Sequence, residues 1–172
     1  GPEDLTDVSI NLASNMLFLA ELGSIEECKE MAREAIANGS AFKKLLELVK
    51  AQGGDASYLE DLDKFDKALY SLEVKSPKTG FVHHMDTEGI GIASVILGAG
   101  RKTKEDIIDF SAGIKLVKKT GDMLSEGDVL AILYTNNQAS LEEAKSKLLD
   151  SYIIDDEDYV DKPLVLARVT PD

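Results

Sequence analysis

The chain has 172 residues, of which 44% are hydrophobic and 30% are charged, and its formal net charge at pH 7 is −13. This composition is typical of a globular protein and excludes collagen-like, low-complexity and fully disordered chains. No apolar run reaches the roughly 18 residues of a membrane-spanning helix, and the negative charge disfavours nucleic acids and anionic membrane surfaces as partners. At roughly 150 residues per domain, we expect one domain or two small ones.

The cysteine content and the N-terminus bear on the cellular compartment. Cys28 is the single cysteine, so it forms neither an internal disulfide bond nor a thiolate metal site by itself. The acidic N-terminus lacks the features of a signal peptide, and we therefore expect a cytoplasmic protein. Because the first residue is Gly1 rather than Met, we expect either a fragment of a longer protein or residues left by a tag protease.

The N-terminal part of the sequence predicts helices. Apolar residues recur at helical spacing from Leu5 to Ala20, from Cys28 to Ile36 and from Phe42 to Val49. Ser24 and Glu27 have the spacing of a capping box, which marks the start of the second helix. Three amphipathic helices of this length bury only a modest core together, so we expect exposed apolar surface that packs on something else.

The pattern changes near residue 70, where strands become the favoured element. Strands are predicted at 72–74, 81–85, 113–117 and 129–134, with weaker candidates at 107–110 and 164–169. Helices are predicted from Asp86 or Thr87 to Leu97 and from Ser140 to Leu149, and the acidic run 155–158 is predicted to be a loop. We therefore expect two bodies, a helical one before about residue 66 and a mixed one after about residue 70.

Several patterns associated with cofactors and metals are weak in this sequence. Gly89 and Gly91 follow a strand and open a helix, as in a dinucleotide-binding fingerprint, but the sixth position of that motif is Ser94. Close packing of the helix on the sheet is the favoured explanation. His83 and His84 are adjacent in a strand, so their side chains point to opposite faces and a shared metal ion is disfavoured. No nucleophile elbow or Walker loop occurs. We expect no catalytic residue, no metal site and no cofactor in this chain.

The loop from Gly98 to Asp106 has two interpretations. Backbone N–H groups at Gly98 and Gly100, with the charges of Arg101 and Lys102, could hold an anion. The alternative, which the residue types favour, is a helix C-cap at Gly98 followed by a solvated basic turn.

The stretch 113–130 is a strand, two Gly-Asp turns and a strand, and it resembles the half-motif of biotinyl and lipoyl carrier domains. The place of the acceptor lysine corresponds to residues 134–138, which contain no lysine. A carrier role is therefore disfavoured.

The collinear order of several motifs indicates a family. These motifs are Gly1–Leu5, Ala51–Ser57, Gly80-Phe81-Val82, Asp86, Ile90-Gly91, Leu97-Gly98-Ala99-Gly100-Arg101, Asp109 and Gly113, with turns at Lys119–Asp122 and Gly127-Asp128. Over nearly the whole chain, they resemble the C-terminal portion of the pyrimidine-nucleoside phosphorylases and thymidine phosphorylases.

The resemblance implies an α+β fold with three parts. Residues 1–66 would be a short helical segment that ends a larger α/β domain. Residues 70–145 would be the family's C-terminal domain, an α/β hammerhead, and residues 146–172 an acidic tail with a possible edge strand. The loop containing Gly98, Gly100, Arg101 and Lys102 would face the substrate cleft and take part in its closure.

The resemblance also implies an activity for the parent enzyme, the phosphate-dependent cleavage of pyrimidine nucleosides to the base and a pentose 1-phosphate. That family's phosphate loop, base-binding residues and potassium ligands lie upstream of the position matching Gly1. We therefore expect this chain alone to be inactive and to need the N-terminal and catalytic parts of a homodimeric parent. The alternative is a free-standing, non-catalytic binding or interaction module that reuses the hammerhead domain.

Overall fold

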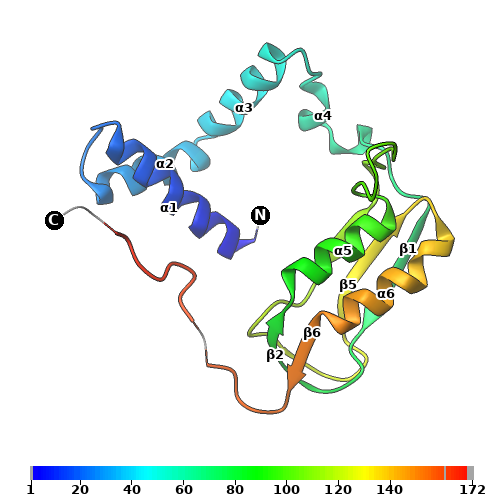
Figure 1. Cartoon of the computed structure of the whole chain (residues 1–172). Coiled ribbons are helices and arrows are strands. Elements are labelled where there is room, and N and C mark those ends of the chain that lie inside the picture. Colours follow the sequence, from blue (N-terminus) through cyan, green and yellow to red (C-terminus); the bar gives the residue numbers. More distant parts are fainter. Residues whose placement is uncertain (1, 161, 170–172) are drawn as a thin grey trace. The chain divides into compact units, whose positions relative to one another are not determined.

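The computed structural model describes residues 2–160 and 162–169, and the chain divides into two compact units (Figure 1). The first unit contains the residues up to Lys64 together with the segment from Lys162 onward. The second unit begins at Phe65 and extends to the residues before Lys162. The division between Lys64 and Phe65 lies next to the change of sequence pattern near residue 70. Within the described ranges, no helix is both long and apolar enough to cross a membrane.

The first unit is built from helices, and the start of one of them follows a local sequence signal. They are α1 (Glu3–Leu19), α2 (Ile25–Ala37), α3 (Ser40–Ala51) and the short α4 (Ser57–Glu60), followed by a 3₁₀ turn at Leu62–Lys64. The predicted capping box is present at the start of α2. Glu27 N donates to Ser24 Oγ at 3.3 Å, and Ser24 N donates to Glu27 Oε2 at 2.8 Å. Because α1 and α2 pack against each other, they provide most of this unit's interior.

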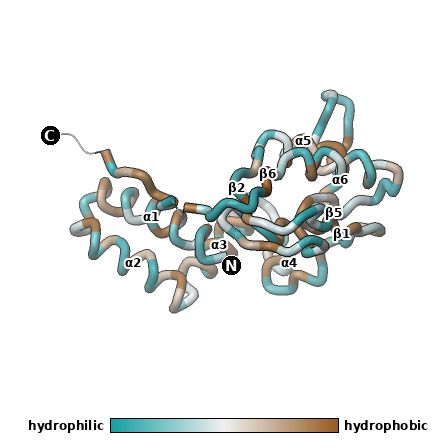
Figure 2. The backbone as a smooth tube through the Cα atoms, turned by 90° about the horizontal axis from the view of Figure 1, so that it is seen from below, coloured by the Kyte–Doolittle hydropathy of each residue, from teal (hydrophilic) through white to brown (hydrophobic). Residues whose placement is uncertain are grey.

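The core of the first unit is small, and much apolar surface stays exposed. Its buried apolar residues are Ile10, Cys28, Ala32 and Ala56, whereas large side chains such as Leu12, Met16 and Leu19 are exposed. Figure 2 shows apolar and polar positions interleaved along α1, α2 and α3. A depression of about 540 Å³ with an almost entirely apolar lining lies between these helices. The prediction of exposed apolar surface on the helices is therefore confirmed.

The second unit contains two antiparallel sheets and two main helices. One sheet has the order β1-β5-β3, with β1 (Tyr70–Lys75), β5 (Val129–Thr135) and β3 (Gly113–Leu116). The other has the order β4-β2-β6, with β4 (Met123–Leu124), β2 (Gly80–Met85) and β6 (Tyr152–Asp155). The helices are α5 (Thr87–Leu97) and α6 (Leu141–Asp150), the latter preceded by a 3₁₀ turn at Gln138–Ser140.

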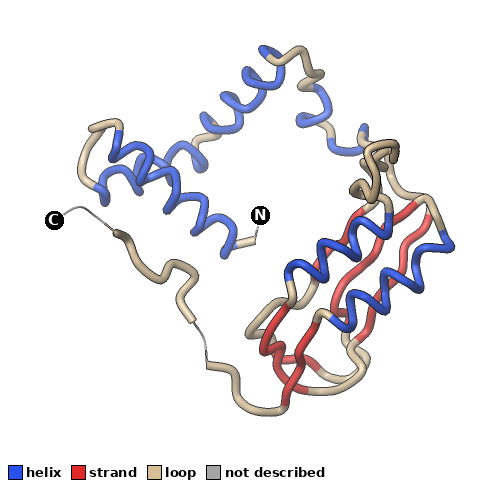
Figure 3. Tube along the Cα trace, in the orientation of Figure 1, coloured by secondary structure: helices blue, strands red, loops and turns tan. Residues whose placement is uncertain are grey.

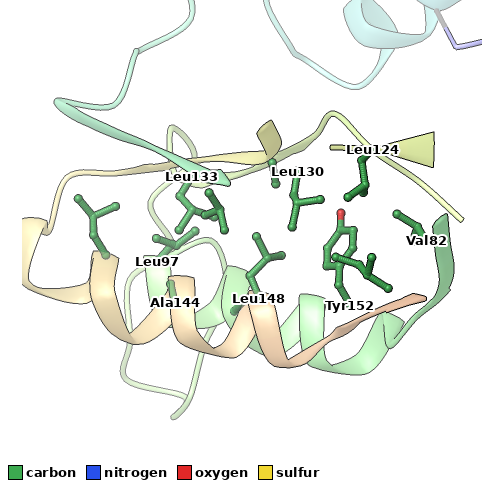
Figure 4. Packing of buried hydrophobic residues seen from close by; sticks show 13 residues of the cluster. Val82, Leu97, Leu124, Leu130, Leu133, Ala144, Leu148 and Tyr152 are labelled. Carbon is green, nitrogen blue, oxygen red and sulfur yellow. The ribbon is translucent and has the colours of Figure 1, made fainter. Parts of the chain in front are cut away.

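Helices α5 and α6 lie side by side and cover one face of the sheet that contains β1 and β5 (Figure 3). Figure 4 shows the apolar side chains between the helices and the strands, among them Leu97 from α5, Leu148 from α6 and Leu133 from β5. Each of these three side chains is almost completely buried. Antiparallel sheets with the helices on one face make this an α+β unit, as predicted.

Two predicted strands are wrong. Residues 107–110 form a loop, in which Asp109 Oδ1 accepts a hydrogen bond from Ser111 N at 2.9 Å and turns the chain. Residues 164–169 form no strand either. Arg168 Nε donates to Asn15 Oδ1 of α1 at 2.8 Å, and the Arg168 guanidinium lies 4.6 Å from the centre of the Phe18 ring. The contacts of this segment are therefore with a helix instead of a sheet.

β6 is one of the two edge strands of the second sheet and pairs with β2, whose other neighbour is β4. It begins after Ser151 at the end of α6, and its last residue, Asp155, is the first residue of the acidic run.

Candidate functional site

The loop after α5 starts at the predicted helix cap. Gly98 has a left-handed conformation (φ 105°), its N–H donates to Val95 O at 3.0 Å, and Ala99 N donates to Ser94 O at 3.1 Å. A Cβ atom at Gly100 would lie 2.7 Å from Val95 Cγ2, so a side chain there would collide with the helix. The N–H groups of Gly98 and Ala99 bond carbonyl oxygens at the end of α5, so they are not available to an external anion.

A carboxylate of the chain itself holds the basic turn. Asp106 Oδ2 accepts hydrogen bonds from Lys102 N at 2.8 Å and Thr103 N at 2.9 Å, and Asp106 Oδ1 accepts one from Thr103 Oγ1 at 3.0 Å. The backbone hydrogen bonds, that of Thr103 first, hold the pKa of the Asp106 carboxyl below its usual value of 3.8. Asp106 thus takes the hydrogen bonds that a bound anion would receive. The structure thus contains the capped helix end at Gly98, followed by a basic turn whose Lys102 and Thr103 N–H groups are bonded to Asp106.

The side chains at the tip of this loop are exposed. Arg101 and Lys102 are both exposed, and no hydrogen bond or ion pair holds the Arg101 guanidinium among the described residues. Ile107 is 92% exposed and Phe110 is 94% exposed, which is unusual for such large apolar side chains. The loop therefore presents a guanidinium and two apolar groups from a backbone that is fixed by internal hydrogen bonds.

A second anchor holds the far end of the loop. Asp109 Oδ1 accepts from Ser111 N at 2.9 Å and from Ser111 Oγ at 2.7 Å, and Asp109 Oδ2 accepts from Asn136 Nδ2 at 2.9 Å. The hydrogen bond from the Ser111 side chain is the largest cause that lowers the pKa of the Asp109 carboxyl. A depression of about 500 Å³ adjoins this anchor, and its lining includes Leu69, Phe110 and Asn136.

Two histidines and two glycines were the other candidate residues considered from the sequence. His83 is half-buried, with Nε2 2.8 Å from the carbonyl oxygen of Glu157 and its ring edge-on to Tyr159, whereas His84 is exposed. Gly89 is buried against Ser151, as close packing of the helix requires, but Gly91 has open space around it.

Sequence reasoning named Gly98, Gly100, Arg101 and Lys102 but overlooked the residues that anchor the loop. Asp106 and Asn136 were assigned no role, and Asp109 entered only as part of a family motif. Two aspartates three residues apart in a loop are a usable signal, because Asp side chains accept hydrogen bonds from nearby backbone N–H groups.

Comparison with known proteins assigns a family to this arrangement. The model of the pyrimidine nucleoside phosphorylase C-terminal domain matches residues 81–155, which include α5, α6, the loop, the strands β3 to β6 and all of β2 except Gly80. The chain contains a pyrimidine nucleoside phosphorylase C-terminal domain. It is 41% identical over 152 residues to a pyrimidine-nucleoside phosphorylase of Staphylococcus haemolyticus, covering 88% of this chain and 35% of that protein. It is 38% identical over 170 residues to one of Staphylococcus aureus, covering 98% of this chain and 39% of that protein.

The chain thus spans little more than a third of the length of these curated relatives. It corresponds to the C-terminal portion of the family, as predicted.

Proposed function

We propose that this chain supplies the cleft-closing part of a pyrimidine-nucleoside phosphorylase, which cleaves pyrimidine nucleosides with phosphate to the base and a pentose 1-phosphate. The observation that carries the proposal is the loop after α5. Its backbone is held by Asp106 and Asp109, while Arg101, Ile107 and Phe110 stay exposed. We call residues 98–112 the closure loop.

Phosphorolysis has a physical requirement that such a loop would meet. Phosphate and sugar must be held within attack distance, and water must be kept out because hydrolysis competes. A loop that docks when substrates are bound satisfies both conditions.

The exposed side chains of the closure loop would favour a closed state. Burying a side chain such as Ile107 or Phe110 gains about 1.5–3 kcal/mol relative to leaving it exposed. The Arg101 guanidinium has a planar set of donors that would bond carbonyl or carboxylate oxygens across the cleft. Since these contacts exist only after closure, they shift the equilibrium toward the closed form.

We assign no catalytic, substrate-binding or metal-binding residue to this chain, and the proposed role needs no cofactor held by it. Its proposed partners are the N-terminal and catalytic parts of a homodimeric, cytoplasmic parent enzyme, with phosphate and a pyrimidine nucleoside as substrates. The chain alone is expected to be inactive. Phosphate-dependent release of uracil or thymine by the purified chain, well above a control without protein, would contradict that expectation.

The closing role is tested by Arg101→Ala in the intact parent enzyme. We expect lower turnover with nearly unchanged folding stability, because an exposed loop arginine contributes little to the core. Lys104→Ala is the matched control, since it removes one positive charge from an exposed side chain of the same loop. Unchanged turnover and an unchanged Michaelis constant in Arg101→Ala would refute the role. A gene that encodes only a chain of this length would instead favour a free-standing interaction module.

A further inference from the structure

We propose that Asn136 is a positioning residue that couples the closure loop to the segment through which the chain enters the second unit. This entry segment, residues 65–69, follows the last turn of the first unit and leads into β1. The coupling is a property of this chain, and its use in closing a cleft rests on the function proposed above.

The side-chain amide of Asn136 bonds both segments at once. Its Nδ2 donates to Asp109 Oδ2 at 2.9 Å and to Ser111 Oγ at 3.0 Å, both in the closure loop. Its Oδ1 accepts from Leu69 N at 2.8 Å, in the entry segment. One planar amide group therefore bonds the closure loop and also Leu69, which lies 67 positions before Asn136 in the sequence.

The orientation of this amide follows from its partners. Exchanging its nitrogen and oxygen would set Oδ1 against the Asp109 carboxylate and Nδ2 against the Leu69 N–H, so both contacts would become repulsive. Because the amide is planar and rigid, a displacement at one end moves or breaks the bonds at the other. The hydrogen bonds to the closure loop form one arm of this link, and the hydrogen bond from Leu69 forms the other. While the bonds of both arms are present, the two segments cannot move independently.

The backbone next to Asn136 is held in place, so the side-chain amide can turn but its attachment point cannot shift. Asn136 follows β5, the central strand of its sheet. The preceding Thr135 is buried, and its Oγ1 donates to Leu97 O, at the end of α5, at 2.7 Å. The start of the closure loop and the base of Asn136 are thus held together, and the side chain links the far end of the loop to the entry segment.

The amide therefore links the position of the entry segment to the conformation of the closure loop. A displacement of the entry segment moves the Leu69 N–H, which pulls on the amide and hence on the Asp109 carboxylate that orients Ser111. In proteins that close around ligands, residues at the ends of elements absorb the backbone changes of closure, and Asn136 lies at such a position after β5. Rearrangement of the entry segment and of the closure loop is therefore expected to occur together.

Amide hydrogen exchange on the 172-residue chain tests the coupling, because the N–H groups of Leu69 and Ser111 report the two arms separately. Asp109→Ala perturbs the loop arm alone, and we expect the Leu69 amide to exchange faster by about threefold or more. Leu69→Pro removes the N–H donor of the entry segment and leaves every loop residue unchanged, and the Ser111 amide should respond by a similar factor. Loss of one hydrogen bond to a charged partner corresponds to about tenfold, so partial transmission gives severalfold.

Two further variants sharpen the result. Asn136→Asp keeps an acceptor for the Leu69 N–H but opposes the Asp109 carboxylate, so it should loosen Ser111 more than Leu69. Gln138→Ala is the control, since this exposed side chain lies two residues further along and has no role in the network. Changes confined to the arm that was mutated, with less than about threefold at the distant amide in both Asp109→Ala and Leu69→Pro, would overturn the coupling.

The exchange experiment involves no substrate, so its outcome is separate from that of the proposed function. Coupled exchange together with normal turnover in Arg101→Ala would leave the positioning role of Asn136 intact and remove the closing role of the loop. Uncoupled exchange together with impaired turnover in Arg101→Ala would do the reverse.

Discussion

Replacing Gly89 by alanine sets a favourable helix effect against an unfavourable steric one at the same position. Gly89 lies in the first turn of α5, and a Cβ atom there would be 2.3 Å from Ser151 Oγ and 2.7 Å from Asp86 Oδ2. Ser151 cannot yield freely, because its Oγ donates to Lys147 O at 2.7 Å and its carbonyl accepts from Asp86 N at 2.8 Å. Gly89 is therefore a point of close approach between α5 and the end of α6.

The two effects differ in size. Helix propensity alone favours alanine over glycine by about 1 kcal/mol. Overpacking a tight contact costs about 1–3 kcal/mol, and displacing Ser151 Oγ from its hydrogen bond adds about 1 kcal/mol. The steric effect wins, and the second unit should lose about 1–3 kcal/mol of unfolding free energy. For a unit of roughly this size, each kcal/mol lowers the melting temperature by about 4–8 °C.

Urea unfolding followed by tyrosine fluorescence measures this loss, because the chain has five tyrosines and no tryptophan. Gly91→Ala is the matched control in the same helix, where no atom lies within 4 Å of the added Cβ, and it should stabilise the protein by up to about 1 kcal/mol. The double variant Gly89→Ala with Ser151→Ala should recover part of the loss, since the clashing oxygen is gone. If Gly89→Ala were as stabilising as Gly91→Ala, the packing argument would be refuted.

Three further predictions concern the core, a helix cap and the closure loop. Leu148→Ala empties a fully buried site in the second unit, and urea unfolding should show a loss of about 2–5 kcal/mol; a loss below 1 kcal/mol would mean that the site collapses around the smaller residue. Ser24→Ala removes the N-cap of α2 and should cost about 1 kcal/mol by thermal unfolding followed by circular dichroism, whereas Ser24→Asp should retain most of that stability. Hydrogen bonds lower the pKa values of Asp106 and Asp109 in the folded chain. The two carboxylates therefore contribute fully to loop order above the usual pKa of 3.8, and this contribution is lost as the pH falls through their lowered pKa values. An NMR titration of the Ser111 amide should therefore show a transition below pH 3.8, and a midpoint at or above that value would contradict the assignment.

Features that depend on neighbours in sequence were predictable. The capping box at Ser24 and Glu27 and the helix end at Gly98 each involve residues three to five positions apart. The strands β2 and β5 were also found, because each contains strand-favouring apolar residues and is bounded by turn residues. Within the candidate site, the sequence therefore located the loop and its glycines.

Composition, helix periodicity and motif order were enough to indicate an acidic α+β chain, the approximate positions of α1, α2, α3, α5 and α6, and the family. Only the tertiary structure decided that β6, and not residues 164–169, pairs with β2 as an edge strand. Both segments are rich in apolar residues, and they differ in their contacts with distant elements, since Arg168 bonds Asn15 of α1. The same holds for Asn136, whose partner Leu69 is 67 residues away. A hydrogen bond over that separation leaves no periodic trace in the sequence, because its geometry exists only after β1 and β5 have paired.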